Sequence, residues 1–228
     1  MGRYARLLSG CAGMLCLATI LLIAGCGGGG STRFRFMNAV PDESNLAVLV
    51  NGTSVNGNVA YGTSTGYQSV QSGAQQVVIE PPGSTTALVT QSITFASGSD
   101  TTVIAYNFSS NIAAMILADD NSAPASGDFK LRIVNAAPGL GPADVYIVAA
   151  GTDLNTVSPN VSNLAFGSAS AYQSMAGGSF EVVLTPVGQK FAAVDTGALT
   201  FSGSQVRTLV GLNSQSGGFS YATLQDVN

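Results

Sequence analysis

The chain has no histidine and no tryptophan, and only three of its 228 residues are cysteine. Without histidine it lacks the commonest general base and metal ligand, and a Ser-His-Asp triad is excluded. Cys11 and Cys16 lie in an N-terminal apolar segment, and Cys26 directly follows it. If that segment is removed and Cys26 is modified, no thiol remains for a disulfide, a zinc site or an iron–sulfur cluster. We therefore expect no metal and no cofactor, and a fold that packing alone stabilises.

Charged residues are also scarce, at 9% of the chain, and the net charge is −4. Loss of Arg3 and Arg6 with the N-terminal segment would leave 6 basic against 12 acidic residues, a net charge of −6. Nucleic acid is not an expected partner, because phosphate neutralisation needs clustered lysine and arginine. The abundance of glycine, serine, threonine, asparagine and valine is typical of β-strands joined by turns.

The N-terminal segment has the order of a secretory signal. Arg3 and Arg6 precede an apolar run from Leu7 to Ile23, as expected for a signal peptide. An uncleaved transmembrane helix is the alternative, since a span needs roughly 20 apolar residues. Gly10 and Gly13 within the run disfavour that alternative.

The end of the segment, Ile23-Ala24-Gly25-Cys26, resembles the bacterial lipobox, whose cysteine is acylated and becomes the first mature residue. The resemblance implies a signal peptide over residues 1–25 and a permanent anchor of three acyl chains, palmitate among them, on Cys26. More than one chain gives stable anchoring. Gly27 after the cysteine resembles sorting to the outer membrane of the bacterial cell envelope. Residues 26–32 are then a glycine-rich tether.

Short motifs recur about 100 residues apart, which indicates an internal repeat. Arg35-Phe36-Met37-Asn38-Ala39-Val40-Pro41 returns as Arg132-Ile133-Val134-Asn135-Ala136-Ala137-Pro138, Tyr61-Gly62 as Phe166-Gly167, and Tyr67-Gln68-Ser69 as Tyr172-Gln173-Ser174. We predict two copies, residues 33–120 and 128–228, joined by a polar linker at 121–127. A linker this short lets the copies reorient but not separate far, and each copy is near the size of a domain that folds alone.

Apolar residues alternate with polar ones in both copies, which favours half-buried strands. Beyond the alternating segments at Phe34–Phe36, Leu46–Val50 and Val77–Ile79 and their counterparts, further candidate strands are 87–95 and 192–201, 101–107 and 207–213, and 112–117 and 219–224. The predicted fold class is all-β, with two tandem antiparallel sandwiches of immunoglobulin-like or transthyretin-like type. Parallel pairing is not expected, because no crossover helix is present.

The chain resembles the bacterial DUF4397 lipoproteins. The resemblance rests on the Asn-Ala-x-Pro opening of each copy, the strand Asp144-Val145-Tyr146 and the two-copy layout behind a lipobox. The first copy has Asn45-Leu46-Ala47 instead, so the resemblance is stronger over residues 129–228. It implies an envelope location and a β-sandwich, and it supplies no catalytic residue.

Four of the six basic residues outside the signal are Arg33, Arg35, Lys130 and Arg132. Their alternation places them on the outward face of the first strand of each copy. They could protect a sheet edge, pair with Asp119, Asp120 or Asp226, or contact lipid phosphates as part of a partner surface. For Asp119-Asp120 itself, we favour a solvated strand end over an acid–base or calcium site.

A second candidate partner surface is the loop around 155–161, with Asn155, Thr156, Val157 and Asn160. This loop is six residues longer than in the first copy, and long loops on rigid scaffolds often carry recognition. Neutral variation in loop length explains the expansion equally well.

Two further pairs of repeated residues have structural interpretations. The tyrosines Tyr67 and Tyr172 either bind a ligand or pack inward with a bonded hydroxyl, and we favour packing. Asn38 and Asn135 are expected to bond backbone groups in a turn.

The predicted function is a non-catalytic binding or structural module, anchored to the membrane by lipid, with an envelope protein or glycan as partner. The alternative is a glycan-cleaving hydrolase that uses carboxylates from separate strands. Its candidates are Asp42, Glu43, Glu80, Asp144, Asp153 and Glu181, two of which would have to meet in one pocket about 5–9.5 Å apart.

Overall fold

The computed structural model describes residues 1–2 and 31–226. Most of the predicted signal peptide, Cys26 and most of the tether lie outside the described residues. The predicted all-β class is confirmed, with 55% of residues in strands and 3% in helix. In the part of the chain that is described, no helix is long and apolar enough to cross a membrane.

The first copy is a sandwich of two four-stranded sheets, ordered β4-β1-β7-β8 and β3-β2-β5-β6. Its elements are β1 (Arg33–Ala39), β2 (Asn45–Val50), β3 (Thr53–Ala60), β4 (Gln68–Ser69), β5 (Gly73–Glu80), β6 (Val89–Phe95), β7 (Asp100–Tyr106), η1 (Ser109–Asn111) and β8 (Ala113–Asp119). Three of these strands match the ranges that alternation predicted to within a few residues.

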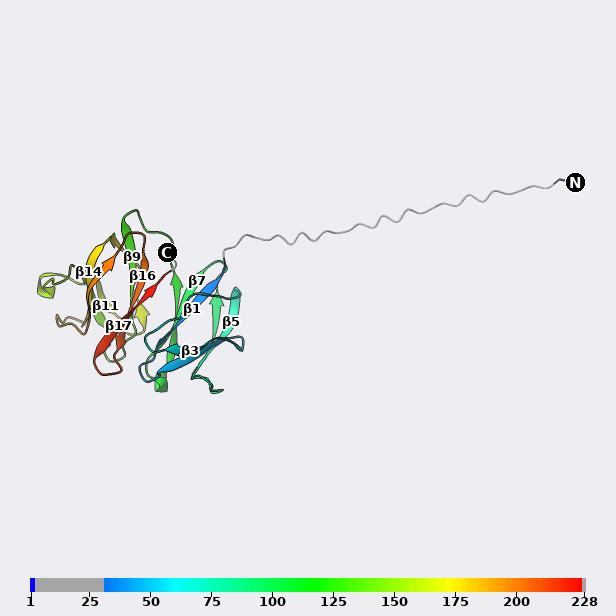
Figure 1. The fold of residues 1–228 in the computed structure, drawn as a ribbon, viewed down its shortest axis with the longest axis horizontal. Helices are drawn as coiled ribbons and strands as arrows, with labels where there is room; N and C mark the ends of the chain where they lie inside the picture. The colour runs from blue at the N-terminus through cyan, green and yellow to red at the C-terminus, as the bar shows by residue number, and fades with distance from the viewer. Residues whose placement is uncertain (3–30, 227–228) are drawn as a thin grey trace.

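The second copy repeats this arrangement, with sheets β12-β9-β16-β17 and β11-β10-β14-β15 and with β13 also paired to β9. Its elements are β9 (Asp128–Asn135), β10 (Ala143–Val148), η2 (Leu154–Thr156), β11 (Val161–Leu164), β12 (Ser168–Ala169), β13 (Gln173–Ala176), β14 (Gly178–Pro186), β15 (Val194–Phe201), β16 (Val206–Asn213) and β17 (Phe219–Gln225). Figure 1 shows the two sandwiches side by side.

The expectation of purely antiparallel sheets is wrong at one pair of strands in each copy. β1 pairs with β7 in parallel over its whole length, and β9 pairs with β16 in parallel from Lys130 to Asn135. No crossover helix is needed, because the chain passes through the opposite sheet between the two paired strands. The intervening strands β2 to β6, and their counterparts in the second copy, make that connection.

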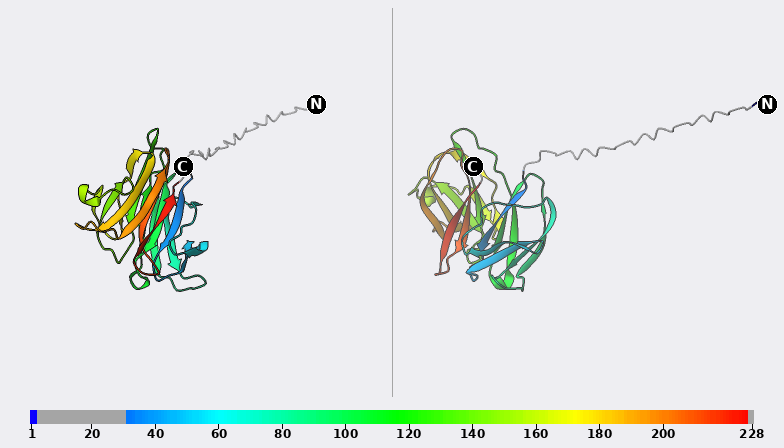
Figure 2. Two further views of the ribbon diagram at one scale, coloured as in Figure 1. Left: turned by 60° about the vertical axis from the view of Figure 1, so that its left-hand side comes forward. Right: turned by 45° about the vertical axis from the view of Figure 1, so that its right-hand side comes forward.

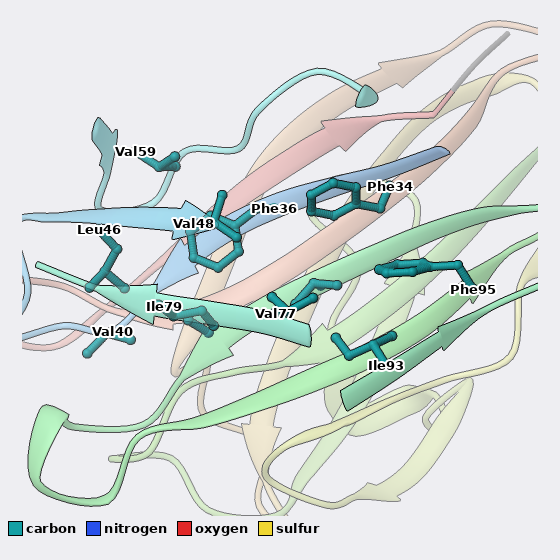
Figure 3. Packing of buried hydrophobic residues seen from close by; sticks show 12 residues of the cluster. Phe34, Phe36, Val40, Leu46, Val48, Val59, Val77, Ile79, Ile93 and Phe95 are labelled. Atoms are coloured by element: carbon teal, nitrogen blue, oxygen red, sulfur yellow. The ribbon is translucent and has the colours of Figure 1, made fainter. Parts of the chain in front are cut away.

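The core of the first copy lies between its two sheets. Side chains from β1, β2, β5 and β6 point toward one another there (Figure 3), with Phe34 and Phe95 at a ring separation of 5.5 Å. The second copy has a matching core in which Phe129 stacks on Phe201 at 4.5 Å. Period-two alternation thus places one face of each strand in a sandwich core.

A third core joins the two copies. It contains Met37, Ala39, Ile104 and Met115 from the first copy and Val134, Ala136, Val210, Leu212 and Leu224 from the second. The sheet with β1 and β7 packs against the sheet with β9 and β16, and β17 lies beside β1 where the copies meet (Figures 1 and 2). The expectation that the copies reorient about the linker is therefore wrong, because buried apolar surface holds them together.

Candidate functional site

The four basic residues of β1 and β9 face the junction between the copies. Arg35 and Arg132 are only 2% and 3% exposed. Edge protection does not explain them, because β1 lies between β4 and β7, and β9 has partners on both sides. Arg35 and Arg132 are also unavailable as a partner surface for lipid phosphates, since the opposite copy covers them.

Six side chains form a closed hydrogen-bonded ring across the junction. Arg35 of the first copy pairs with Asp226 of the second, and Arg132 of the second pairs with Asp119 of the first at 2.6 Å. Two threonines close the ring. Thr102 accepts from Arg35 Nε at 2.8 Å and donates to Asp119 at 2.6 Å, while Thr208 accepts from Arg132 Nε at 3.2 Å and donates to Asp226 at 3.3 Å.

The ring is reciprocal, because each copy supplies an arginine to the carboxylate of the other. The pairing expected with Asp119 and Asp226 is therefore confirmed. The solvated strand end expected at Asp119 is wrong, because that side chain is 0% exposed. Burial of two charge pairs is tolerable only where hydrogen bonds satisfy the remaining polar groups, and the two threonines supply several of them.

The two repeated tyrosines cover the ring from either end. The guanidinium carbon of Arg35 lies 4.8 Å from the ring centre of Tyr67, and that of Arg132 lies 4.7 Å from Tyr172. Tyr67 donates its hydroxyl to Asp119 at 2.6 Å, and Tyr172 donates to Asp226 at 3.3 Å. Burial raises the pKa of both hydroxyls. The tyrosines thus take the structural role that we favoured, with a carboxylate as acceptor.

The remaining two basic residues lie at the margin of the junction. Arg33, whose side chain is 31% exposed, pairs with Asp100 at 2.7 Å, and Lys130 pairs with Asp120 at 2.8 Å. The hydrogen bond from Lys130 lowers the pKa of Asp120 to about 2. These pairs are partly open to solvent, so each contributes little to stability.

The repeated Tyr61-Gly62 and Phe166-Gly167 motifs also meet the opposite copy. Gly167, at φ +73°, would place a Cβ 2.7 Å from the ring of Tyr106. Phe166 packs edge-on against the same ring at 5.4 Å. In the other direction, Gly62 approaches Leu212, and Tyr61 donates its hydroxyl to the carbonyl of Asn213.

Asn38 and Asn135 have the turn role expected of them. Each donates its amide to two backbone carbonyls and accepts a backbone N–H two residues later. Both are fully buried, so these bonds satisfy polar groups that solvent cannot reach.

The long loop of the second copy bonds to β10 and to the connection between β14 and β15. Lys190 donates to the carbonyl of Val157 at 2.8 Å, and the side chain of Asn160 accepts the N–H of Ile147 at 2.7 Å. Asn155 and Thr156 are exposed. The loop lies on the side of the second copy away from the first (Figure 1). A partner at this loop stays a prediction.

Four of the six carboxylates proposed for a hydrolase accept hydrogen bonds from backbone N–H groups of their own copy. Asp42 accepts from Ser109, Asp144 from Asn163 and Gly188, Asp153 from Asn155, and Glu181 from Gly151. Their acceptor capacity is directed at the chain itself, which is a structural use of a carboxylate.

Sequence reasoning missed a pocket of ≈ 300 Å³ in the first copy, at the open side between β3 and β4. Its lining residues are all uncharged: Phe34, Val50, Asn51, Thr53, Val55, Ser69, Val70, Gln71 and Gln75. Gln75 is buried, accepts from the amide of Asn51 and donates to the carbonyl of Ser72 at 3.4 Å. A signal was present in the sequence, because Gln75 interrupts an apolar alternation where the second copy has Phe180.

The sequence profile of DUF4397, a domain of unknown function, matches residues 32–146. The chain belongs to the DUF4397 family. The match covers the whole first copy and ends in β10 of the second. The expectation that the resemblance is stronger over residues 129–228 is therefore wrong.

No curated protein matches the chain. Among solved structures, it is similar to a family 26 carbohydrate-binding module from Eubacterium rectale Amy13K, crystallised with maltoheptaose, at 10% identity and a TM-score of 0.29. That alignment covers 86% of this chain and 98% of the other. A protein from Bacteroides uniformis with a predicted role in cell adhesion is similar at 12% identity and a TM-score of 0.26, over 86% and 99% of the two chains. Similarity at this level says nothing about the ligand of this chain.

Proposed function

We propose that this DUF4397 chain is a non-catalytic binding module of the bacterial cell envelope. A lipid on Cys26 holds it at the outer membrane, and the pocket of the first copy binds its ligand. The second copy completes the buried ring and the shared core, so the pocket is presented on one rigid body. This arrangement suits a receptor more than an enzyme, because two buried arginine–aspartate pairs join the copies and four of the six candidate carboxylates bond to backbone N–H groups.

The observation that carries the proposal is the buried Gln75 at the pocket. Gln75 and Phe180 occupy equivalent places in the two copies. Each follows by two residues a glycine that pairs with a phenylalanine of the next strand: Gly73 pairs with Phe95, and Gly178 pairs with Phe201. A buried amide is less favourable for folding than a well-packed ring unless all its polar atoms are used. Polar groups that reduce stability are typical of functional sites.

Photo-crosslinking in living cells tests the binding role even while the ligand is unidentified. With benzoylphenylalanine at Gln71, an exposed residue of the pocket rim, we expect a discrete adduct. The same probe at Thr90, exposed on β6 and outside the pocket lining, is the matched control. Gln75→Phe should remove the Gln71 adduct. Equal adducts at both positions, or an adduct unaffected by Gln75→Phe, would contradict a binding role for the pocket.

The anchor has its own test. Cys26→Ser should leave an unprocessed precursor or release the protein from the membrane fraction, because the acylated side chain is lost. Fractionation followed by mass spectrometry of the N-terminus measures this, with Cys16→Ser as the control inside the apolar segment. Normal processing and unchanged membrane retention of Cys26→Ser would refute lipid anchoring.

A further inference from the structure

We propose that the pocket of the first copy takes one neutral pyranose residue of a glycan, read by the side-chain amides of Asn51 and Gln75. This inference names the ligand class for the binding role proposed above and rests on it. The second copy has an aromatic ring at the equivalent place, so each chain binds one such residue.

The lining matches the two kinds of surface on a sugar ring. Val50, Val55 and Val70, which are partly exposed, provide apolar surface for the C–H faces of a pyranose, whereas the ring of Phe34 is itself buried. The amides and hydroxyls of Asn51, Thr53, Ser69, Gln71 and Gln75 provide donors and acceptors for its hydroxyl groups. Apolar walls with a few placed polar groups are typical of small-molecule sites. The absence of charge among these lining residues favours a neutral sugar over a phosphorylated or acidic one.

The amides are held in place by the protein's own hydrogen bonds. Asn51 accepts the backbone N–H of Gln76 at 2.9 Å and donates to Gln75. A primary amide has two N–H donors and an oxygen with two lone pairs, so both side chains keep capacity for a ligand. Groups fixed before binding lose little entropy when the ligand arrives.

The neighbouring strands favour a sugar over an extended peptide. A peptide that adds to a sheet edge needs a regular row of backbone groups. β4 has only two residues, and the pairing of β2 with β3 shifts register twice. Bulges of this kind interrupt the edge ladder, so side chains rather than backbone are the available contacts.

In the second copy an aromatic ring takes the place of the amide. Phe180 lies where Gln75 lies in the first copy, and its ring is 5.4 Å from Phe129 and 6.4 Å from Phe201. Phe129 is the counterpart of Thr32 in the first copy. The next residues, Lys130 and Arg33, are the first in their strands to pair with the parallel strand of their own copy, β16 and β7 respectively. These aromatic side chains supply apolar packing where the first copy has a polar pocket.

The test uses the mature chain, residues 26–228 with Cys26→Ser, and isotope-detected NMR of side-chain amides. Glucose, galactose and mannose, and disaccharides of each, are titrated separately, with a neutral Ala-Ser-Val peptide as the competing class. We expect one of the sugars to shift the amide signals of Asn51 and Gln75 with a Kd on the order of millimolar, as suits about twelve heavy atoms. Gln75→Phe should weaken binding at least roughly tenfold while the chain stays folded, since a ring is accommodated at the equivalent place in the second copy.

Gln76→Phe is the matched control, because Gln76 is the exposed neighbour on the opposite face of β5. It should bind like the parent chain. Val55→Phe fills the pocket from β3 and replaces Gln75→Phe as the test if that variant does not fold. Shifts from the peptide alone, or no response to any of these sugars while the Gln71 crosslink persists, would overturn the sugar assignment and leave the binding role standing. Sugar binding unchanged by both filling variants would place the sugar elsewhere and also overturn it.

Discussion

Replacing Arg35 by alanine is expected to lower the free energy of unfolding by about 3–5 kcal/mol, the usual result of removing one partner from a buried ion pair. Asp226 would lose its arginine partner at a position that is 2% exposed. Its remaining partners, Thr208 and Tyr172, are both at 3.3 Å and neither is charged. Urea denaturation of the mature chain, followed by fluorescence or circular dichroism, measures the change.

Arg33→Ala is the control for Arg35→Ala. Arg33 lies two residues away on the same strand and also pairs with an aspartate, but its side chain is 31% exposed. A pair of that kind contributes about 0.2–1 kcal/mol. The double variant Arg35→Met with Asp226→Leu should recover most of the loss, because apolar replacement of both partners removes the uncompensated charge. If Arg35→Ala loses no more stability than Arg33→Ala, the ring does not have the energetic role assigned here.

The strands themselves could be predicted from the sequence, because alternation is a local property of the chain. Residues such as Phe34 and Phe36 repeat with period two, and that period alone places them in a sandwich core. The same period placed Arg35 on the outward face, which is correct. The residues that cover the outward face lie about 190 positions away in the sequence, Asp226 among them. A local pattern does not predict which distant residues will pack there.

The repeated motifs carried more information than their strand content. Arg35, Gly62 and Tyr67 recur as Arg132, Gly167 and Tyr172. The arginines belong to the ring, the tyrosines bond to it, and the glycines lie against side chains of the opposite copy. Repeated arginine, glycine and tyrosine residues therefore lie at the junction, whereas the repeated Asn38 and Asn135 hold turns within their own copies. The pocket was harder to anticipate, because its signal is a difference between the copies, Gln75 against Phe180, and a search for similarity passes over differences.

The two copies are expected to unfold in a single transition. Their shared core takes four residues from the first copy and five from the second, and each copy supplies half of the ring. Neither copy can then unfold without exposing apolar surface and unpaired charges on the other. Calorimetry of the mature chain should give a calorimetric enthalpy equal to the van 't Hoff enthalpy.

Val182→Asp makes the coupling between the copies visible. Val182 lies in the core of the second copy and is fully buried, so an unpaired carboxylate there should destabilise the chain by about 4 kcal/mol or more. Because the junction transmits the loss, hydrogen exchange should accelerate not only in β14 but also at Val103 and Ile104 on β7 of the first copy. Protection of β7 that survives Val182→Asp, or two separate calorimetric transitions, would show that the first copy folds on its own. Loss of that protection would mean that the pocket between β3 and β4, in the copy nearer Cys26, depends on the second copy for its shape.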